Sequence, residues 1–429
     1  MKKLTLTTVA IGLFLLVLVV SAAVYLLVDE RAPNVADLMP PARVELPENE
    51  NALGRWQEAG RKFVEPGNWL DILHAQDGGE LEGGKVIVWG SREIQDVLVQ
   101  NAEALRLVDE GLALGKLQVP QSDRIMVGDG RGCLGHWRDL SWLLETRVYA
   151  LSAAGMHREA LDEALKIIRF GNIMQHGEGA GTEYVISLRI KKDCGYPAFS
   201  KALCPADVDA ASLAEYSRQI ASLIDSGDAL ANTLRREFLI MVNPTDGFGS
   251  GRLPDDDIGS LSPTTWDNLL FLPNATQNLF ADICRASIRN IPRRPDQYEV
   301  SEAARRLKRF EKSRLPHVVH RNSSGMTWIA GWGWCMLDDC LFLERLEDVA
   351  LNRGIRLLIA LKLYKMKHGG LPPSLDDLVP EFIEAVPEDP FDGKPFRYNP
   401  AKKAVYSVGE YGEDNEADEQ RDIVIKIEF

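Results

Sequence analysis

Basic residues are the scarcer of the two charged classes in this chain. Its 429 residues include 49 Lys and Arg against 63 Asp and Glu, a formal net charge of -14 at pH 7. A nucleic-acid-binding surface needs basic residues for the phosphates, so we exclude nucleic acid as the main partner. Apolar residues make up 45% of the chain, which is enough for real cores and excludes wholesale disorder. The length leaves room for two or three domains.

Short motifs that name a reaction are also missing. His317 and His320 are three residues apart, whereas a zinc-protease helix needs histidines four apart with a glutamate between them. Cys133 stands near His136 and Asp139, which suits cysteine catalysis only if the fold brings thiol and base together. A glycine-rich loop before a helix explains this stretch equally well, and it lacks the Gly-Lys-Ser/Thr end of a phosphate-binding loop. We therefore name no catalytic residue.

Cysteine is sparse, and no two cysteines have the C-x-x-C spacing of a redox or zinc motif. Two pairs, 194 with 204 and 335 with 340, are close in sequence, and disulfides would suit an exported chain. Both pairs lie among apolar residues, so buried free thiols are the alternative and a zinc site is not expected. The six cysteines are Cys133, Cys194, Cys204, Cys284, Cys335 and Cys340.

Charge is absent from the twenty positions 9–28. At about 1.5 Å per residue, such a helix spans the hydrocarbon layer of a bilayer, which is roughly 30 Å thick. Lys2 and Lys3 precede the run, and the positive end of such a helix stays in the cytoplasm. We expect a single-pass anchor in the cytoplasmic membrane, with the bulk of the chain on the outer, periplasmic side. The alternative is a cleaved signal peptide with its cleavage zone at 21–23, which also exports the chain.

Four prolines fall between residues 32 and 50, where large apolar residues are few. This composition is typical of an extended spacer that lifts a folded body off the membrane. Beyond it the apolar pattern is helical to about residue 345, and it changes to short strands after residue 370. We expect four parts: a transmembrane anchor at 1–31, a Pro-rich spacer at 32–50, a helical domain at 51–345 and an α+β module at 346–429.

Helices dominate the predicted body, so the expected fold class is mainly α, with an irregular helical body. One apolar stripe covers residues 94–112, and two more on either side of Gly155 predict an antiparallel helix pair. Residues 243–300 are expected to be rich in loops. Further helices are expected at 208–225, 228–242, 301–312 and 338–368.

Two segments near the end of the body have more than one interpretation. Trp328, Trp332 and Trp334 stand among glycines. Packing in a core is the first interpretation, and an exposed surface for a sugar, a peptide or the membrane interface is the alternative. Residues 293–314 form a basic run in an acidic chain. A solvated helix with ion pairs one turn apart explains this run, and a docking face for an acidic partner is the alternative.

The change of period after residue 370 predicts a small sheet. Ser374 is placed to cap a short helix, and strands are expected at Pro395–Tyr398, at Ala404–Val408 and in the last eight residues. Seven acidic residues fall within positions 410–422. Because so many carboxylates on one loop repel one another, this loop is either solvated or held by positive charge.

The tail contains three short motifs in a fixed order. They are a helix that ends in tyrosine and a Gly-Leu-Pro turn, an Asp-Pro-aromatic hairpin, and Tyr-Ser-Val-Gly followed by an acidic loop that closes on Asp-Ile. In this order of motifs the tail resembles the globular part of the major pseudopilin of type II secretion systems, over about 80 residues of the chain. The matching residues are Tyr364, Gly369, Gly370, Leu371, Pro372, Asp389, Pro390, Phe391, Gly393, Pro395, Phe396, Tyr398, Tyr406, Ser407, Gly409, Asp422 and Ile423.

The resemblance implies a calcium site, because the acidic loop of that family binds calcium. Calcium takes six to eight hard oxygen ligands from carboxylates, amides and backbone carbonyls. At the position of one further family ligand this chain has Tyr411, so a solvated acidic loop without metal is the alternative. The implied ligands are the carbonyl of Val408 and the side chains of Asp414, Asn415, Asp418 and Asp422.

The N-terminus departs from that family, since it has neither a Gly-Phe cleavage point nor an acidic residue among its first 28 positions. The whole layout resembles that of large bacterial envelope proteins with such a tail. We therefore expect a membrane-anchored envelope protein with a structural or protein-interaction role, associated with type II secretion or pilus-like machinery and with other envelope proteins as partners. The alternative is an exported hydrolase whose site is assembled from distant residues of the helical body.

Overall fold

The computed structural model describes residues 2–69, 71–72, 87–120, 131–242, 271–313, 320–332 and 340–429, with side chains except at 2–7, 131–135, 331, 332 and 340. The described chain is mainly helical, with a three-stranded antiparallel sheet near its C-terminus, as the sequence predicted. Its elements are α1 (Lys2–Leu27), η1 (Ala36–Leu38), η2 (Glu48–Glu50), α2 (Leu53–Lys62), α4 (Arg92–Gln100), α5 (Ala102–Leu114), α6 (Arg131–Ala153), α7 (His157–Gln175), α8 (Gly181–Arg189), η4 (Ile190–Gly195), α9 (Tyr196–Leu203), α10 (Ala210–Ala221), α11 (Asp228–Met241), α13 (Pro273–Asn290), η6 (Pro295–Gln297), α14 (Glu302–Glu311), α15 (Ser323–Trp332), α17 (Cys340–His368), η8 (Leu375–Leu378), β1 (Arg397–Asn399), β2 (Ala404–Ser407), η9 (Gly409–Tyr411) and β3 (Ile423–Lys426).

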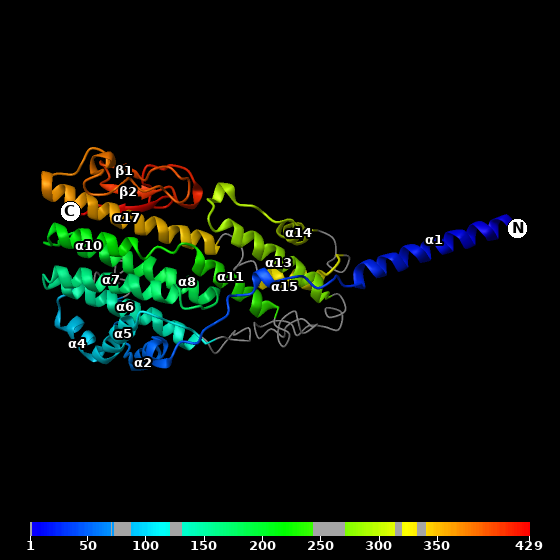
Figure 1. Cartoon of the computed structure of the whole chain (residues 1–429), viewed down its shortest axis with the longest axis horizontal. Helices are drawn as coiled ribbons and strands as arrows, with labels where there is room; N and C mark the ends of the chain where they lie inside the picture. Colours follow the sequence, from blue (N-terminus) through cyan, green and yellow to red (C-terminus); the bar gives the residue numbers. More distant parts are fainter. Residues whose placement is uncertain are drawn as a thin grey trace.

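Helix α1 stands apart from the rest of the molecule and projects from one end (Figure 1). Its residues Thr8–Leu27 have a mean hydropathy of 2.8, and none of this span is buried inside the protein. Twenty residues of helix are about 30 Å long, which matches the hydrocarbon layer of a bilayer. Within the described chain, α1 is the one helix that is long and apolar enough to cross a membrane.

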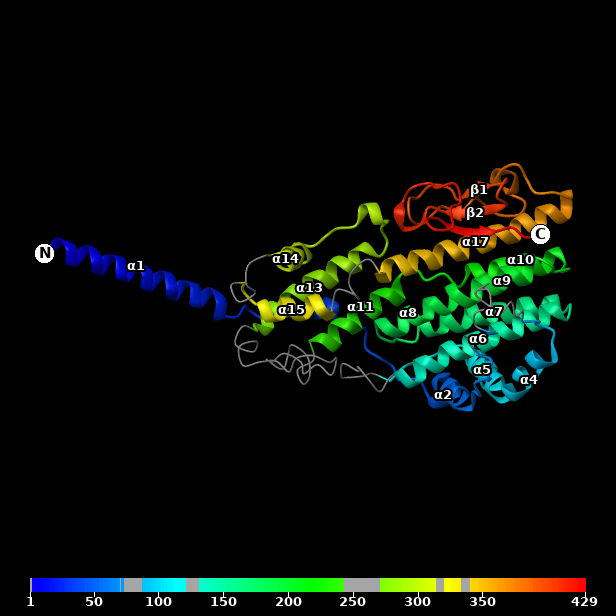
Figure 2. The same ribbon diagram turned by 180° about the vertical axis from the view of Figure 1, so that it is seen from behind.

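Two apolar cores divide the rest of the molecule into two lobes. The distal lobe consists of α2, α4 to α7, α9, α10, most of α17 and the sheet, and Trp56 and Ile168 lie in its core. The proximal lobe, next to α1 in Figure 1, consists of α11, α13, α14 and α15, and its core includes Phe238 and Phe280. In the distal lobe the sheet lies on α17, whereas α2, α4 and α5 lie on the opposite side of α6 to α10 (Figure 2).

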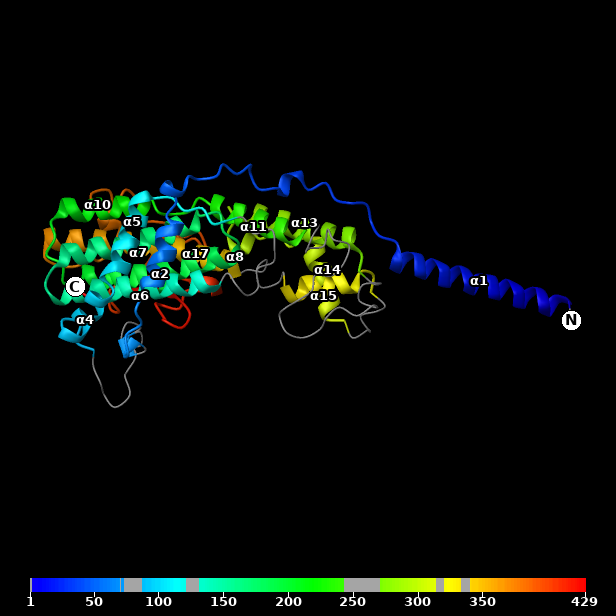
Figure 3. The same ribbon diagram turned by 90° about the horizontal axis from the view of Figure 1, so that it is seen from below.

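Residues 32–50 do not hold the body away from α1, which corrects the spacer interpretation. They run along the outside of both lobes, from the end of α1 to the start of α2 (Figure 3). Leu38 is buried in the proximal core. The side-chain amide of Gln118 accepts from the N–H of Leu46 at 2.8 Å and donates to the carbonyl of Val44 at 3.0 Å. Because this extended segment finds partners on the folded surface, we call residues 32–50 the strap.

Helix α17 belongs to both lobes. Its first turn places Leu341 in the proximal core, and Leu346 and Leu358 further along lie in the distal core. A Cβ on Gly354 would collide with the side chain of Ile425 on β3, so the close packing of sheet and helix requires glycine here. The predicted boundary between residues 345 and 346 falls inside this continuous helix, and the tail shares its core with the body.

The predicted strands are confirmed as an antiparallel meander in the order β1-β2-β3. Val405 on the central strand pairs with Tyr398 on β1 and with Ile425 on β3. All four residues of β2 are buried, as expected for a strand with a neighbour on each side and α17 behind it. The hydroxyl of Ser374 accepts from the N–H of Asp376 at the start of η8, which confirms the predicted cap.

Two predictions for the helical body are wrong. The stripe at 94–112 forms two helices, α4 and α5, because the buried Asn101 between them bonds through its side-chain amide to the backbone of Val64. Within the segment 243–300, for which we expect many loops and no helix, residues 273–290 form α13, which begins at Pro273 and buries Phe280. Proline suits the first position of a helix because its missing N–H would have no partner there. The antiparallel pair on either side of Gly155 is confirmed as α6 and α7.

Candidate functional site in the C-terminal module

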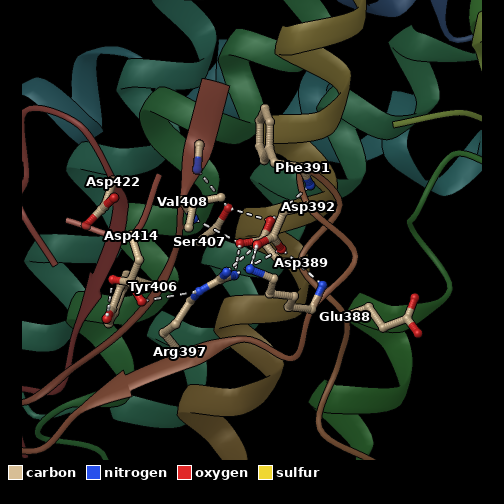
Figure 4. A network of polar contacts seen from close by, with 12 residues as sticks. Glu388, Asp389, Phe391, Asp392, Arg397, Tyr406, Ser407, Val408, Asp414 and Asp422 are labelled. Carbon is tan, nitrogen blue, oxygen red and sulfur yellow. Dashed lines mark hydrogen bonds and ion pairs between the residues drawn. The ribbon is translucent and has the colours of Figure 1, made fainter. Parts of the chain in front are cut away.

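Two of the blocks that carry the resemblance, the Asp-Pro-aromatic turn and Tyr-Ser-Val-Gly, meet around one buried carboxylate, that of Asp389 (Figure 4). Asp389 begins the turn before β1, and Ser407 ends β2, 18 positions further along the chain. The antiparallel pairing of β1 and β2 brings the two together, because Arg397 at the start of β1 lies opposite Tyr406. Turn, strand β1 and the end of β2 therefore supply one set of polar groups.

Asp389 is completely buried, and protein donors surround it. Its carboxylate accepts from the N–H of Phe391 at 3.0 Å, the hydroxyl of Ser407 at 2.8 Å and the N–H of Val408 at 2.9 Å. The guanidinium of Arg397 donates to it at 2.8 Å. An ionised carboxylate has about four acceptor positions, so the protein satisfies this group fully. We call these residues the Asp389 network, and it fixes the turn to both strands.

Arg397 is the cation of this network. It donates to Asp389 and forms an ion pair with Asp392, and its Nε lies 3.8 Å from Asp414 in the acidic loop. Burial is the largest single effect and raises the pKa of Asp392, but the contacts with Arg397 and Lys394 together outweigh it and keep that pKa below its usual value. One arginine thus offsets carboxylates from the turn and from the acidic loop.

Three of the predicted calcium ligands lie side by side in the loop between β2 and β3. The amide Nδ2 of Asn415 is 3.3 Å from one carboxylate oxygen of Asp422, and the N–H of Asp418 donates to the other at 3.1 Å. Asp422 is buried, which gives the three side chains a fixed centre. The structure therefore brings Asn415, Asp418 and Asp422 together.

The other two predicted ligands, Asp414 and Val408, make their hydrogen bonds to residues outside this group of three. Asp414 accepts a hydrogen bond from the hydroxyl of Tyr406 at 3.0 Å. Burial and this bond to a carboxylate both raise the pKa of Tyr406 above its ordinary value. Val408 stands at the start of η9, with its N–H on Asp389.

This arrangement is not a ready-made calcium shell. Both oxygens of Asp422 already accept hydrogen bonds, Asp418 accepts from the N–H of Gln420 at 3.0 Å, and the oxygen of Asn415 accepts from Arg421 at 3.4 Å. Among the residues that the structure describes, no three His, Cys, Asp or Glu side chains are grouped to hold a metal ion. Calcium binding by this loop stays a prediction.

A lysine from the turn between β1 and β2 holds the acidic loop. Lys402 donates to the carbonyl of Glu416 at 2.7 Å, and the side-chain amide of Asn399 donates to the same carbonyl at 3.3 Å. Glu416 and Ala417 have φ values of 57° and 64°, which residues with a side chain rarely adopt. Lys402 bonds to the backbone of the loop, and Arg397 and Lys426 lie against its carboxylates of Asp414 and Glu419, so protein cations hold this loop.

A second buried polar network lies in the helical body, and sequence reasoning missed it. The ammonium of Lys191, which is completely buried, donates to Asp348 at 2.6 Å and to Gln175 at 2.7 Å. The hydroxyl of Tyr196 donates to the other oxygen of Asp348 at 2.9 Å. A Cβ on Gly171 would lie 2.6 Å from Cγ of Lys191, so this glycine leaves room for the lysine. We call these residues the Lys191 network.

No sequence signal could have identified the Lys191 network. Lys191 lies in η4, a π-helical segment between α8 and α9, and 157 positions separate it from Asp348. A π-helical turn has no composition of its own, and it often marks a position where a helix accommodates a special side chain. Only the packing of α17 against η4 shows that this lysine has a counter-charge.

A groove of about 450 Å³ lies where the strap crosses the ends of α5 and α7. Its ionisable side chains include Lys116, His176 and Glu178. Nδ1 of His176 is 2.9 Å from the carbonyl of Asn172, and its Nε2 is 4.0 Å from Asp225. The hydroxyl in the groove, that of Ser222, donates to a backbone carbonyl. This groove does not supply the paired nucleophile and base that the hydrolase alternative requires.

The histidine and tryptophan motifs have structural roles where the structure describes them. His320 packs edge-on against Phe310, and its Nε2 lies 3.0 Å from the hydroxyl of Ser313. Trp328 is buried in the proximal core, in line with the core interpretation. His317 and Trp334, and the side chain of Trp332, lie outside the described residues.

The described cysteines are free thiols, so Cys194 and Cys204 do not form a disulfide. Cys194 and Cys284 are buried, and burial raises the pKa of both thiols well above its usual value. Burial also raises the pKa of Cys204 to about 11. Thiols with raised pKa values are poor nucleophiles, which suits packing rather than catalysis. The structure does not describe the side chains of Cys133, Cys335 and Cys340.

Comparisons with known proteins do not assign the chain to a family. The chain matches no protein-family model, no curated protein and no solved structure. The resemblance of the tail therefore rests on its motif residues.

Proposed function

We propose that the protein is a single-pass envelope protein whose folded body is fixed directly to its membrane anchor and presents the C-terminal module to other envelope proteins. The junction between α1 and α13 carries this proposal. The carboxylate of Asp29 accepts from the N–H of Asn274 at 2.9 Å and from the N–H of Ala275 at 3.0 Å. First-turn N–H groups have no partner inside their helix, so Asp29 caps α13 and offsets its dipole.

Arg321 joins α1 to the proximal lobe at a second point. Its guanidinium donates to the carbonyl of Tyr25 at 2.6 Å and lies 3.5 Å from Glu30 and 5.5 Å from the ring of Tyr25. The last carbonyls of a helix lack intrahelical partners, and a cation there complements the helix dipole. With Asp29 and Arg321 both engaged, the anchor continues into the body without a free linker.

The proposed orientation puts Lys2 and Lys3 in the cytoplasm and the residues after α1 on the outer, periplasmic side of the cytoplasmic membrane. The sheet and most of α17 belong to the distal lobe, at the opposite end of the molecule from α1 (Figure 1). A body fixed to its anchor would hold this module at a set height above the bilayer. This geometry suits a scaffold better than a tethered enzyme that must reach its substrate.

The proposed contact surface is the C-terminal module, in association with type II secretion or pilus-like machinery. Support comes from a long helix packed on a three-stranded antiparallel sheet, with the motif residues Asp389, Phe391 and Ser407 in one network. Because a fold does not determine a function, the partner needs a direct test.

Membrane fractionation and protease accessibility test the anchor. We expect the full chain to stay with the membrane after an alkaline wash that removes peripheral proteins. Added protease should digest the body only when the outer surface of the cytoplasmic membrane is exposed. A variant with Leu15→Arg and Val19→Arg should no longer insert, because charges at the bilayer centre are costly. A wild-type chain in the soluble fraction, or one protected from protease, would contradict the proposal.

Photo-crosslinking in cells tests the partner. Tyr411 in the module is 59% exposed and Val99 on α4 is 72% exposed, so photoreactive residues at these two positions form a matched pair. We expect adducts with envelope proteins from position 411 and few from position 99. Equal adducts at both positions, or none at 411, would contradict a contact role for the module.

Thermal unfolding of the whole chain in detergent tests calcium, since the tail shares its core with the body. A ligand at 100 times its dissociation constant, bound only to the folded state, adds about 2.7 kcal/mol. A rise with millimolar calcium but not magnesium, abolished by Asp418→Asn with Asp422→Asn, would establish the site. Asp376→Asn with Asp377→Asn at η8 is the control. No rise, or an equal rise with magnesium, would leave a loop held by protein cations such as Lys402, Arg397 and Lys426.

A further inference from the structure

Charge is distributed unevenly between the two ends of the molecule. Residues 271–313 and 320–332, which form most of the proximal lobe, hold ten Arg and Lys against five Asp and Glu. The whole chain, in contrast, has a net charge of -14. The lobe nearest α1 is therefore basic in an acidic protein.

Helix α14 carries much of this positive charge on one face. Its buried side packs Ala303, Leu307 and Phe310 into the proximal core. On the opposite face, cations follow one another at spacings of three, four and seven residues, and side chains at these spacings lie on the same side of a helix. Glu302 pairs with two of them. The exposed cations of this face are Arg305, Lys308, Arg309 and Lys312.

The C-terminal end of α14 is two side-chain contacts away from the membrane helix. The rings of Phe310 and His320 lie with their centroids 5.3 Å apart. The hydroxyl of Ser313 lies 3.0 Å from Nε2 of His320. The next residue, Arg321, bonds to Tyr25, which lies inside the apolar span. Figure 2 shows α14 and α15 at the end of the body that adjoins α1. The C-terminal end of α14, where Lys312 stands, therefore lies near the level at which α1 leaves the bilayer.

We propose that the exposed basic face of α14 binds the anionic lipid headgroups of the bilayer that holds α1. Attraction between surface charges reaches roughly 8–10 Å at physiological salt, and lysines and arginines beside an anionic leaflet are attracted to it. Arginine also matches the geometry of a phosphate with two parallel hydrogen bonds. An acidic protein would satisfy the same charges, but inserted α1 brings the bilayer to this end of the molecule in every copy.

This inference rests on the proposed membrane anchoring and adds a second attachment to it. The junction at Asp29 and Arg321 fixes the body to one point of α1, which leaves the tilt of the body open. A lipid contact at α14 would set that tilt. The body would then stand at one angle on an anionic membrane and lose that restraint on a neutral one.

Photo-crosslinking from α14 in lipid nanodiscs tests the inference with the full chain. A photoreactive residue replaces Glu311, which is exposed between the cations, and a second one replaces Glu215, which is partly exposed on α10 of the distal lobe. In discs that contain phosphatidylglycerol we expect lipid adducts at position 311 and few at position 215. In discs of phosphatidylcholine alone the yield at 311 should fall about fivefold or more.

Variants that remove charges identify the residues that bind the lipid headgroups. Lys308→Gln with Lys312→Gln should lower the lipid adduct at position 311 about tenfold. Arg55→Gln with Arg218→Gln, which removes two exposed cations of the distal lobe, should leave it unchanged. A thermal melt checks that both variants are folded. Equal losses in the two variants would overturn the inference.

The outcomes separate this inference from the proposed anchoring. A chain that does not enter the disc contradicts anchoring itself. A chain that enters the disc but gives no lipid adduct at 311, or equal adducts in both lipids, overturns headgroup binding alone. Protein adducts at 311 in cells, without lipid adducts, would assign the face to an acidic protein partner and also overturn it.

Discussion

The two buried ion networks differ in how far apart their members lie in the sequence. The Asp389 network is drawn from a turn and two neighbouring strands, and Asp389 and Val408 are 19 positions apart. The Lys191 network joins residues 157 positions apart, on η4 and α17. A local network orders one small module, whereas a distant one ties a long helix to the body. We therefore expect the distant network to cost more when it is broken.

Glu237 in the proximal lobe is the contrast to both networks. It is buried, and its carboxylate accepts from the N–H of Gly181 at 2.6 Å. In the part of the chain that the structure describes, it has no ion pair with a cation. Burial raises the pKa of Glu237 to about 7. A buried carboxylate with a cation and one without thus respond differently to mutation and to pH.

The largest effect is expected from Asp348→Ala. This change leaves Lys191 buried without a counter-charge, which costs about 3–5 kcal/mol of the free energy of unfolding. Denaturant unfolding of the full chain in detergent measures the loss. The double variant Lys191→Met with Asp348→Leu removes both charges and should regain most of it. A double variant as unstable as the single one would show that packing, rather than the ion pair, dominates here.

Asp389→Ala should have the next largest effect, about 2–4 kcal/mol, because it leaves buried donors without an acceptor. Arg397 keeps Asp392 as a partner, which makes the loss smaller than that of Asp348→Ala. Asp392→Ala is the control and should cost only about 1 kcal/mol, because Arg397 keeps the carboxylate of Asp389 as its partner. If the Asp392 variant is as unstable as the Asp389 variant, the buried donors around Asp389 do not dominate the stability of this network.

Glu237 predicts a loss of stability as the pH rises. Its folded-state pKa of about 7 lies above the usual 4.5, so the folded protein binds more protons than the unfolded chain between these values. The stabilisation is complete below about pH 4.5 and is lost as the pH rises through 7, by about 2–3 kcal/mol. Unfolding at pH 5 and pH 8 measures it. Glu237→Gln should lack this part of the pH dependence, and an unchanged pH profile would contradict the assignment.

The smallest of these effects is expected at the junction between α1 and α13. Asp29→Ala removes the cap of α13 and should cost about 1 kcal/mol. Hydrogen exchange in the first turn of α13 should also become faster. Asp37→Ala, which breaks an exposed ion pair with Arg285, is the matched control and should cost at most about 0.5 kcal/mol. Equal exchange at α13 in the two variants would argue against a capping role for Asp29.

Local patterns in the sequence predicted the elements that depend on neighbouring residues. The apolar run of α1, the helix pair around Gly155, the Ser374 cap and the strands of the tail all have signals within a few positions. The break at Asn101 was missed because its cause is the backbone of Val64, 37 positions away. Helix α13 was missed because the capping carboxylate for its first turn comes from Asp29, more than 240 positions earlier.

For the candidate site, the sequence identified the tail and its acidic loop but not the groups that hold them. Motif order pointed to Asp389, Ser407 and Asp422. The roles of Arg397 and Lys402 became visible only in the folded hairpin. Side-chain partners in a hairpin depend on register, and short motifs carry little information about register.

By itself, the sequence determined that this protein has one long apolar helix, a mainly helical body and a small sheet at its end. Each of these follows from the spacing of apolar residues along a helix or strand. Only the tertiary structure decided that the strap lies on the body, that α17 joins both lobes, and that Lys191 meets Asp348. Burial and ion pairing depend on which distant segments pack together, and local spacing does not contain that information.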